Sequence, residues 1–321
     1  MLVVTPNLCF DRTLWTDRFE VGTVSRPYEV AVTAGGKGVN VVRTLRDLGK
    51  GARLLGLVPE GQGAELERLL ADEGTDLLPV RVGGSVRSTT IVVESDGRGT
   101  VLNEPGAQVG EAECEALLTA LAEQLAAEET PGIVVCAGSL PPGLPEDTYG
   151  RIVRLAHEHG ARVLVDASRR ALAAALPFGP DAVTPNLGEA EMVLDGTDTE
   201  PSSHDEDVAT TRAAALHAAA RLRELGVGTA VVTAGSQGVA WVEEDGSEHW
   251  EPSREVALVN PIGAGDSFVG GLAAALEERQ DWGTAVPYAV AVAGAAVEQA
   301  TAGRVDAARV AELATLPQAR A

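Results

Sequence analysis

Short apolar runs alternate along the chain with longer stretches of helical periodicity. Three runs contain almost no charged residue, which is typical of strands buried on both faces: Ile133–Cys136, Val163–Val165 and Ala230–Thr233. Helical periodicity is predicted over residues 111–128, 145–160, 207–226 and 264–279. Strands that alternate with helices in this way predict an α/β protein with a mostly parallel sheet covered on both faces.

Two segments interrupt the alternation, residues 12–34 and 79–103. In the second, Thr89–Glu94 and Thr100–Asn103 flank the turn-forming stretch Ser95–Gly99, a pattern that predicts a hairpin. We therefore expect a small antiparallel β lid, formed by both segments and inserted in the α/β body of a single domain of residues 1–321. The polar stretch 196–207 predicts an exposed loop.

The chain is strongly acidic. Its 321 residues include 47 Asp and Glu against 25 Lys and Arg, which gives a net charge of −22. This charge argues against a nucleic acid or an anionic membrane as partner. A phosphate ligand would need a local group of positive side chains, for which Lys37 and Arg87 are the candidates.

The sequence also indicates a compartment. Residues 1–7 lack the basic and extended apolar segments of a signal peptide, and the apolar stretch Ala285–Val297 is too short to cross a bilayer. Cys9, Cys114 and Cys136 are odd in number and form no Cys-x-x-Cys pair, which argues against a disulfide framework and a zinc site. We expect a cytoplasmic protein.

A glycine loop near the C-terminus carries the strongest chemical signal. Gly263-Ala264-Gly265-Asp266 leads into the alanine-rich helix predicted from residue 264. Amides of a first helical turn attract an anion, whereas a carboxylate beside them repels one at rest. Asp266 is therefore a candidate base that takes a proton from a hydroxyl while the amides stabilise a transferred group. The structural alternative is an acidic residue stabilised by the helix dipole.

A second glycine loop lies near the N-terminus, in the sequence Gly35-Gly36-Lys37-Gly38-Val39-Asn40. Lys37 is one of only two lysines in the chain, the other being Lys50. The glycines allow close approach of a ligand, Lys37 offers a charge for a phosphate or hydroxyl, and Asn40 is predicted to open a helix that runs to about Leu48. The alternative is a glycine turn with a solvated lysine.

These two loops resemble the signatures of the pfkB, or ribokinase-like, family of ATP-dependent sugar kinases. Weaker motifs follow in the family's order over essentially the whole chain. The resemblance implies a three-layer αβα ribokinase-like fold with a β lid, and ATP and Mg²⁺ as cofactors. It implies Asp266 as the catalytic base and Gly263, Ala264 and Gly265 as the amides that stabilise the transferred phosphoryl group.

The resemblance also implies the acceptor side of the site. Asp11, in the segment Asn7–Thr13, matches the family's sugar-binding aspartate, and Arg87 is placed like an arginine that holds a substrate phosphate. Ser139 lies in a Gly-Ser-Leu-Pro-Pro-Gly loop that lines the substrate side. Gly35, Gly36, Lys37 and Asn40 complete the implied substrate contacts. For Arg87 the alternative is a solvated lid arginine, and for the Ser139 loop a proline-rich turn.

On the nucleotide side, Asn186 and Glu189 resemble the family's Asn-x-x-Glu motif, in which Glu189 would act on Mg²⁺ through water. The same pattern is an ordinary capping box. Thr233, Gly235 and Gly238 match a loop whose backbone approaches ATP. Three positions depart from the family pattern: Leu8 stands for a usual Pro, Thr184 for a common Lys, and Arg169-Arg170 for Gly and an acidic or polar residue.

The resemblance is nearest to the branch that acts on hexose phosphates, which contains 1-phosphofructokinases, tagatose-6-phosphate kinases and minor 6-phosphofructokinases. It implies transfer of the γ-phosphoryl group of ATP to a ketohexose phosphate, first fructose 1-phosphate. Tagatose 6-phosphate, fructose 6-phosphate, an unphosphorylated sugar, nucleoside or polyol, and a non-catalytic binding protein are the alternatives. The resemblance also implies a homodimer that forms through the lid.

Overall fold

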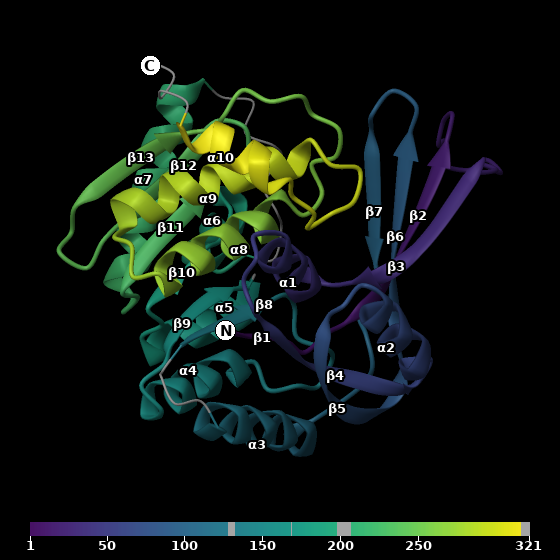
Figure 1. The fold of residues 1–321 in the computed structure, drawn as a ribbon, viewed down its shortest axis with the longest axis horizontal. Coiled ribbons are helices and arrows are strands. Elements are labelled where there is room, and N and C mark those ends of the chain that lie inside the picture. Colours follow the sequence, from purple (N-terminus) through teal and green to yellow (C-terminus); the bar gives the residue numbers. More distant parts are fainter. Residues whose placement is uncertain (128–131, 168, 198–206, 316–321) are drawn as a thin grey trace.

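The large sheet of this computed structural model has nine strands (Figure 1). The structure describes residues 1–127, 132–167, 169–197 and 207–315. In spatial order the strands are β13 (Glu248–Pro252), β12 (Gly238–Val242), β11 (Thr229–Thr233), β10 (Ala182–Val183), β9 (Arg162–Asp166), β8 (Ile133–Ala137), β1 (Leu2–Thr5), β4 (Arg53–Gly61) and β5 (Asp76–Ser85).

Seven neighbouring strands, from β11 to β5, run parallel, and β12 and β13 continue the sheet antiparallel at one edge. The carboxyl ends of the parallel strands therefore meet along one edge of the sheet. In open α/β sheets, ligands bind outside these ends. The mostly parallel sheet that the sequence predicts is confirmed.

Strand side chains alternate between two apolar cores, which makes three layers. In β1, Leu2 and Val4 face one core and Val3 faces the other. The first core is covered by α3 (Glu111–Ala127), α4 (Thr148–Glu158), α5 (Arg169–Ala175), α6 (Leu187–Asp195) and α7 (Val208–Glu224). The second is covered by α1 (Lys37–Asp47), α2 (Gly63–Asp72), α8 (Ala264–Glu277) and α9 (Trp282–Val297), with α10 (Ala307–Thr315) packed on α9. In the described ranges, no helix is long and apolar enough to span a membrane.

A second sheet of four strands stands away from the body and forms the lid (Figure 1). Its spatial order is β3 (Glu29–Gly35), β2 (Cys9–Thr16), β6 (Arg87–Glu94) and β7 (Gly99–Asn103). The two outer pairs are antiparallel hairpins, and β2 and β6, which join them, run parallel. Residues 95–98 form the predicted turn.

Two boundaries differ from those that the sequence predicts. Residues 79–85 are not in the lid, because they form the second half of β5, which pairs in parallel with β4. Only Val86 separates β5 from β6, so no break in composition marks the passage from one sheet to the other.

Helix α1 begins at Lys37, with Gly36 as its N-cap, so Asn40 lies in its first turn and does not open it. In the predicted loop 196–207, residues 198–206 lie outside the described residues.

Candidate active site

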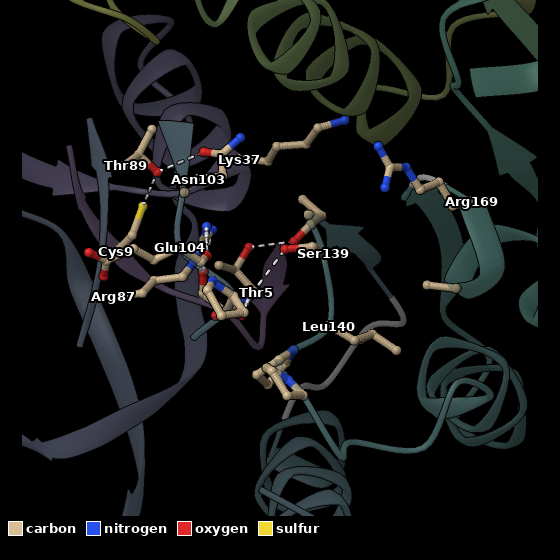
Figure 2. Close-up of a pocket in the computed structure, with 18 of the residues that line it drawn as sticks. Thr5, Cys9, Lys37, Arg87, Thr89, Asn103, Glu104, Ser139, Leu140 and Arg169 are labelled. Carbon is tan, nitrogen blue, oxygen red and sulfur yellow. Dashed lines mark hydrogen bonds between the residues drawn. The ribbon is translucent and has the colours of Figure 1, made fainter. Parts of the chain in front are cut away.

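One large pocket, of about 1070 Å³, lies between the carboxyl edge of the main sheet and the lid (Figure 2). This volume is enough for two small ligands side by side. The predicted site residues that line it are Asp11, Gly36, Lys37, Asn40, Arg87, Ser139, Glu189 and Asp266. Residues far apart in the chain therefore meet here, since Asn40 and Asp266, which are 226 positions apart, are hydrogen-bonded.

Asp266 lies in the first turn of α8 and is buried there, with 7% of the residue exposed. The helix starts after Gly263, whose φ of 82° is a conformation that favours glycine. Asn40 Nδ2 donates a 2.8 Å hydrogen bond to Asp266 Oδ2. Burial raises the pKa of Asp266, while Lys37 and the hydrogen bond from Asn40 act in the opposite direction. A buried carboxylate of raised pKa at a helix start is suited to accept a proton.

The N-terminal glycine loop connects lid and body, because β3 ends at Gly35 and α1 follows Gly36 directly. A Cβ atom on Gly35 would lie 2.3 Å from the carboxylate of Asp11. A larger residue at this position would therefore displace the carboxylate of Asp11. The carboxylate of Asp11 thus lies beside this loop, and Lys37, the first residue of α1, follows the loop.

The Lys37 ammonium is surrounded by carboxylates from three elements. Its Nζ lies 3.2 Å from Asp166 Oδ2, at the end of β9, and 3.6 Å from Glu189 Oε1, in α6. Burial would lower the pKa of Lys37, but the charges of Asp166, Glu189 and Asp266 outweigh it and raise the pKa. Lys37 therefore stays protonated and holds an acidic cluster together.

Asp166 was not predicted from the sequence. Its side chain is 5% exposed, and Oδ2 has no hydrogen-bond partner among the described residues. Burial raises its pKa, which Lys37 partly offsets. Thr184, one of the three departures from the family pattern, lies 3.4 Å from Asp166 Oδ1 and donates its hydroxyl to it. The signal that could have found Asp166 is its place, the last residue of a buried parallel strand.

Asn186 and Glu189 form the capping box at the start of α6. Asn186 Oδ1 accepts from the amide of Glu189 (2.8 Å), and Glu189 Oε2 accepts from the amide of Asn186 (3.0 Å). This structural interpretation is confirmed. Glu189 Oε1 takes no part in the cap and faces Lys37. With Asp166 Oδ2, which is buried and faces the same ammonium, it offers the hard oxygen ligands that a magnesium ion prefers, directly or through water.

The lid supplies one face of the pocket through strand alternation. Asp11 in β2, Thr89 in β6 and Asn103 in β7 are paired across the sheet, so they share the face toward the pocket. Thr89 Oγ1 donates to Asn103 Oδ1 at 3.0 Å, and Cys9 Sγ lies 3.4 Å from Asp11 Oδ1. Burial raises the pKa of Asp11. Polar groups that can bind hydroxyls thus line the base of the lid.

Arg87 opens strand β6 at the base of the lid (Figure 2). Its guanidinium donates to the backbone carbonyl of Asn7 (3.0 and 3.2 Å) and to that of Glu104 (3.2 Å). In the part of the chain that the structure describes, no carboxylate pairs with it. Backbone carbonyls fix the position of the guanidinium without cancelling its charge, which leaves a positive group on the pocket wall.

The Ser139 loop is fixed between lid and body. Asn7 Nδ2 donates to Ser139 Oγ (3.1 Å) and to the carbonyl of Pro105 (3.1 Å), where the lid returns to the body. From below, the buried Tyr149 hydroxyl donates to the carbonyl of Gly138 (3.0 Å). These contacts hold the loop after β8 beside the loop after β1, as the parallel sheet requires.

The nucleotide residues predicted from the sequence lie at the same edge of the sheet but outside the lining of this pocket. Asn186 and Thr233 are joined by a short parallel bridge between the ends of β10 and β11. Gly235 belongs to the turn between β11 and β12, and Gly238 is the first residue of β12. A Cβ atom on Gly238 would lie 2.4 Å from the carbonyl of Glu251. Gly238 is therefore also required by packing against β13.

Arg169 is a second cation that the sequence did not assign to the site. It begins α5 with a φ of 56°, which is uncommon for a residue other than glycine, and it lines the pocket. In the view of Figure 2, the ends of the Arg169 and Lys37 side chains point toward one another. Both residues line the pocket, so it contains a second basic side chain at its body end in a strongly acidic protein.

The sequence model of the pfkB family of carbohydrate kinases matches residues 1–307. The chain belongs to this family. It is therefore a phosphotransferase that acts on an alcohol group and uses ATP. The sequence prediction of a ribokinase-like sugar kinase is confirmed.

Individual relatives refine this result. A 1-phosphofructokinase from Xanthomonas campestris pv. campestris is 36% identical over 281 residues, which cover 86% of this chain and 83% of the relative. The structure of phosphofructokinase-2 from Escherichia coli with fructose-6-phosphate superposes with a TM-score of 0.83 at 26% identity, covering 98% of this chain and 97% of the other. Ribokinase from Thermotoga maritima, at 22% identity, shares the fold with a TM-score of 0.74 over 97% of this chain and 98% of the other. The kinase is of the phosphofructokinase type.

Proposed function

We propose that residues 1–321 form one kinase domain that phosphorylates fructose 1-phosphate to fructose 1,6-bisphosphate. The observation that carries this proposal is the pairing, in one pocket, of a buried carboxylate at the start of α8 with an unneutralised arginine at the base of the lid. The first can activate a hydroxyl and the second can bind a phosphate that the acceptor already carries. The relatives named 1-phosphofructokinase support the choice of acceptor.

In the proposed reaction, Asp266 accepts the proton of the primary hydroxyl as the hydroxyl oxygen attacks the γ-phosphorus of ATP in line. The bond from the γ-phosphorus to the β,γ-bridging oxygen breaks, and ADP leaves. The first amides of α8, at Gly263, Ala264 and Gly265, have no side-chain cap among the described residues. The Ala264 amide donates one long bond, of 3.4 Å, to the carbonyl of Pro261, so these amides are placed to stabilise charge on the transferred group.

Asp11 and Arg87 would bind the acceptor from the lid. Asp11 accepts hydrogen bonds from sugar hydroxyls, and the Arg87 guanidinium forms a two-pronged contact with the sugar phosphate. Gly36 and Ser139 line the pocket and would let the sugar approach the backbone, while Gly35, at the end of β3, would leave room for the Asp11 side chain. Lys37 is placed against Asp166 and Glu189, so we assign it to the phosphoryl group in transfer rather than to the phosphate of the acceptor.

ATP would lie along the neighbouring edge, over Asn186, Thr233, Gly235 and Gly238, with its γ-phosphate toward Lys37. Asp166 and Glu189 would hold Mg²⁺, directly or through water, and the ion would neutralise phosphate charge. Lys37 and Arg169 add positive charge on the same side of the pocket. The proposal rests on this charge, since a net charge of −22 would otherwise repel the nucleotide.

The test is an ATP-consumption assay with Mg²⁺ on a panel of acceptors: fructose 1-phosphate, fructose 6-phosphate, tagatose 6-phosphate, free hexoses, ribose and nucleosides. We expect turnover to be highest by far on fructose 1-phosphate. Turnover confined to unphosphorylated acceptors would refute the role of Arg87 and leave that of Asp266. The likeness to a structure with fructose-6-phosphate makes that sugar the second candidate.

We also propose a homodimer that forms through the lid. Val30 and Val32, on the edge strand β3, and Leu102, on the opposite edge strand β7, share the face opposite the pocket and are 46%, 47% and 55% exposed. An apolar sheet face of this kind is typical of an interface. In analytical ultracentrifugation we expect a dimer that Val32→Glu dissociates, whereas Leu225→Glu, at an exposed leucine on the body, leaves it intact. A monomeric native protein would refute the proposal.

The buried free thiols of Cys9, Cys114 and Cys136 support the cytoplasm as the compartment that we propose.

A further inference from the structure

A buried arginine lies behind the site, outside every motif that the sequence analysis singled out. Arg43 belongs to α1 and is 2% exposed, which makes it the largest fully buried side chain in the described part of the chain. Arginine is almost never buried to this degree unless its charge and donors are satisfied. The contacts that satisfy Arg43 lead to the candidate base.

The guanidinium of Arg43 joins three elements. Its Nε and Nη2 donate to the carboxylate of Glu73, at the end of α2, over 2.6 and 2.7 Å. Nη2 also donates to the carbonyl of Ala34 (2.7 Å), one residue before the glycine that faces Asp11. Nη1 donates to Oδ1 of Asn40 (3.0 Å), which lies one turn earlier on the same face of α1.

Asn40 carries the contact from Arg43 to Asp266. Its Oδ1 accepts from Arg43, and its Nδ2 donates to Asp266 Oδ2. A flipped amide would place its NH₂ group against the guanidinium and its oxygen against the carboxylate, and both contacts would be repulsive. The charges at the two ends therefore allow one orientation of the amide, which directs an N–H bond at the carboxylate.

The consequence is a base with one oxygen held and one left for the acceptor. Asp266 Oδ2 is engaged by Asn40, and within the described ranges no hydrogen bond engages Oδ1. A carboxylate fixed in this way presents a defined lone pair to a hydroxyl, and small errors in such an orientation are costly. Among the described residues, Arg43 donates no hydrogen bond to any other residue of the pocket lining, so its direct link to the candidate base runs through Asn40.

We propose that Arg43 is a positioning residue for phosphoryl transfer, which holds the Asn40 amide so that it orients the Asp266 carboxylate. The inference rests on the proposed role of Asp266 as the base. A buried ion pair adds little net stability compared with apolar packing, so stability alone does not account for the pair of Arg43 with Glu73. The bidentate pair fixes the guanidinium, and the guanidinium fixes the amide.

The role predicts a change in pH dependence. The Asn40 amide favours the charged form of Asp266, so loosening it raises the pKa of that carboxyl and moves the acidic limb of kcat/KM to higher pH. The other charged groups that face Asp266 are Lys37 on α1, Asp11 on β2, Asp166 on β9 and Glu189 on α6. All four residues are kept in an Arg43 variant, but the charge of Arg43 itself lowers the pKa of Asp11, so Arg43→Lys, which keeps that charge, is needed beside Arg43→Met.

The experiment compares pH profiles of kcat and kcat/KM for the native enzyme, Arg43→Met, Asn40→Ala and the double variant. For Arg43→Met we expect a kcat about tenfold lower, an acidic limb higher by about one pH unit, and a nearly unchanged KM. The double variant should lose no more than Asn40→Ala alone, because both changes act through the same amide. Losses that multiply, or a limb that does not move, would overturn the proposal.

Two further variants separate positioning from folding. Arg46→Met is the matched control, because Arg46 lies on the same helix and donates to the backbone carbonyl of Glu73. We expect Arg46→Met to keep the acidic limb of kcat/KM at the native pH, even if the variant has a lower melting temperature. Arg43→Lys is also the variant to use if Arg43→Met does not fold. It keeps the positive charge but lacks the planar guanidinium that donates to Glu73 and Asn40 together, so the acidic limb of the pH profile should move in the same direction by a smaller amount. An unmoved limb in the folded lysine variant would refute the proposal.

Asp266→Asn distinguishes this inference from the proposed function. Full turnover by Asp266→Asn would overturn the base and the positioning role together. An inactive Asp266→Asn with an unmoved limb in Arg43→Met would overturn the positioning role alone.

Discussion

Lys37 and Arg87 are both basic side chains in one pocket, and the structure places them in opposite electrostatic environments. At the body end, Lys37 lies among Asp166, Glu189 and Asp266, so its charge is matched several times over. At the lid end, Arg87 is bound by two backbone carbonyls, and its charge has no carboxylate partner among the described residues. The sequence, by contrast, offered both as equivalent phosphate ligands.

The difference indicates a division of labour. An ammonium within a cluster of carboxylates controls their pKa values and is available to a polyanion that brings its own cation, as a nucleotide with Mg²⁺ does. An unmatched guanidinium attracts a single phosphate at rest. The body end is thus suited to transfer and the lid end to recognition of the acceptor. Variants at the body end should therefore change mainly kcat, and variants at the lid end should change mainly the KM of the acceptor.

The largest effect is expected at the body end, from Asp266→Asn. The amide keeps the shape and the hydrogen-bonding capacity of the side chain but cannot accept the hydroxyl proton. We expect kcat to fall by about 10² to 10⁴ or more, with sugar binding measured by calorimetry largely intact. Near-native turnover would remove Asp266 as the base and with it the distinction between the two ends.

Lys37→Met should give the next largest effect. Without the ammonium, the pKa values of Asp166 and Asp266 rise, so both carboxyls are protonated at a higher pH and activity is lost sooner as the pH falls. We expect kcat at neutral pH to drop by roughly 10², with an acidic limb displaced upward and a smaller change in the KM of the sugar. Lys50→Met is the matched control, since Lys50 pairs at the surface with Glu278. A change confined to the KM of the sugar would contradict this assignment.

Arg87→Ala should have the smallest effect on turnover. The loss of a charge-assisted contact with the acceptor phosphate should raise the KM of fructose 1-phosphate about 10- to 100-fold and leave kcat within a few-fold of the native value. Arg98→Ala is the lid control, because Arg98 pairs with Glu94 at the far end of the hairpin. A fall in kcat with an unchanged KM would contradict this assignment, because Arg87 would then act in phosphoryl transfer and not in binding the acceptor.

The body of the fold was predictable because buried parallel strands are marked by uninterrupted apolar runs. β8, β9 and β11 include the three runs that the sequence predicts, and α3, α4, α7 and α8 lie within the predicted helical ranges to a few residues at each end. β5 was partly assigned to the lid because its residues alternate between exposed and half-buried, as those of a lid strand do. Local pattern does not show which sheet a half-buried strand joins.

The site was predictable where a motif brings its own chemistry, as at Lys37 and Asp266. It was not predictable where function depends on burial and partners. Asp166 becomes notable through its burial beside the ammonium of Lys37, and Arg43 through four hydrogen bonds to Glu73, Ala34 and Asn40. These are properties of tertiary contacts, which neither spacing nor composition shows.

The most direct test of the division of labour compares two acceptors in two proteins. The ratio of kcat/KM for fructose 1-phosphate to that for unphosphorylated fructose is measured in the native enzyme and in Arg87→Ala. We predict that the native enzyme strongly prefers the phosphorylated sugar and that the ratio falls about 10- to 100-fold in the variant, while kcat/KM for fructose stays nearly constant. An equal loss on both sugars would contradict the account, because Arg87 would then not distinguish a phosphate from a hydroxyl.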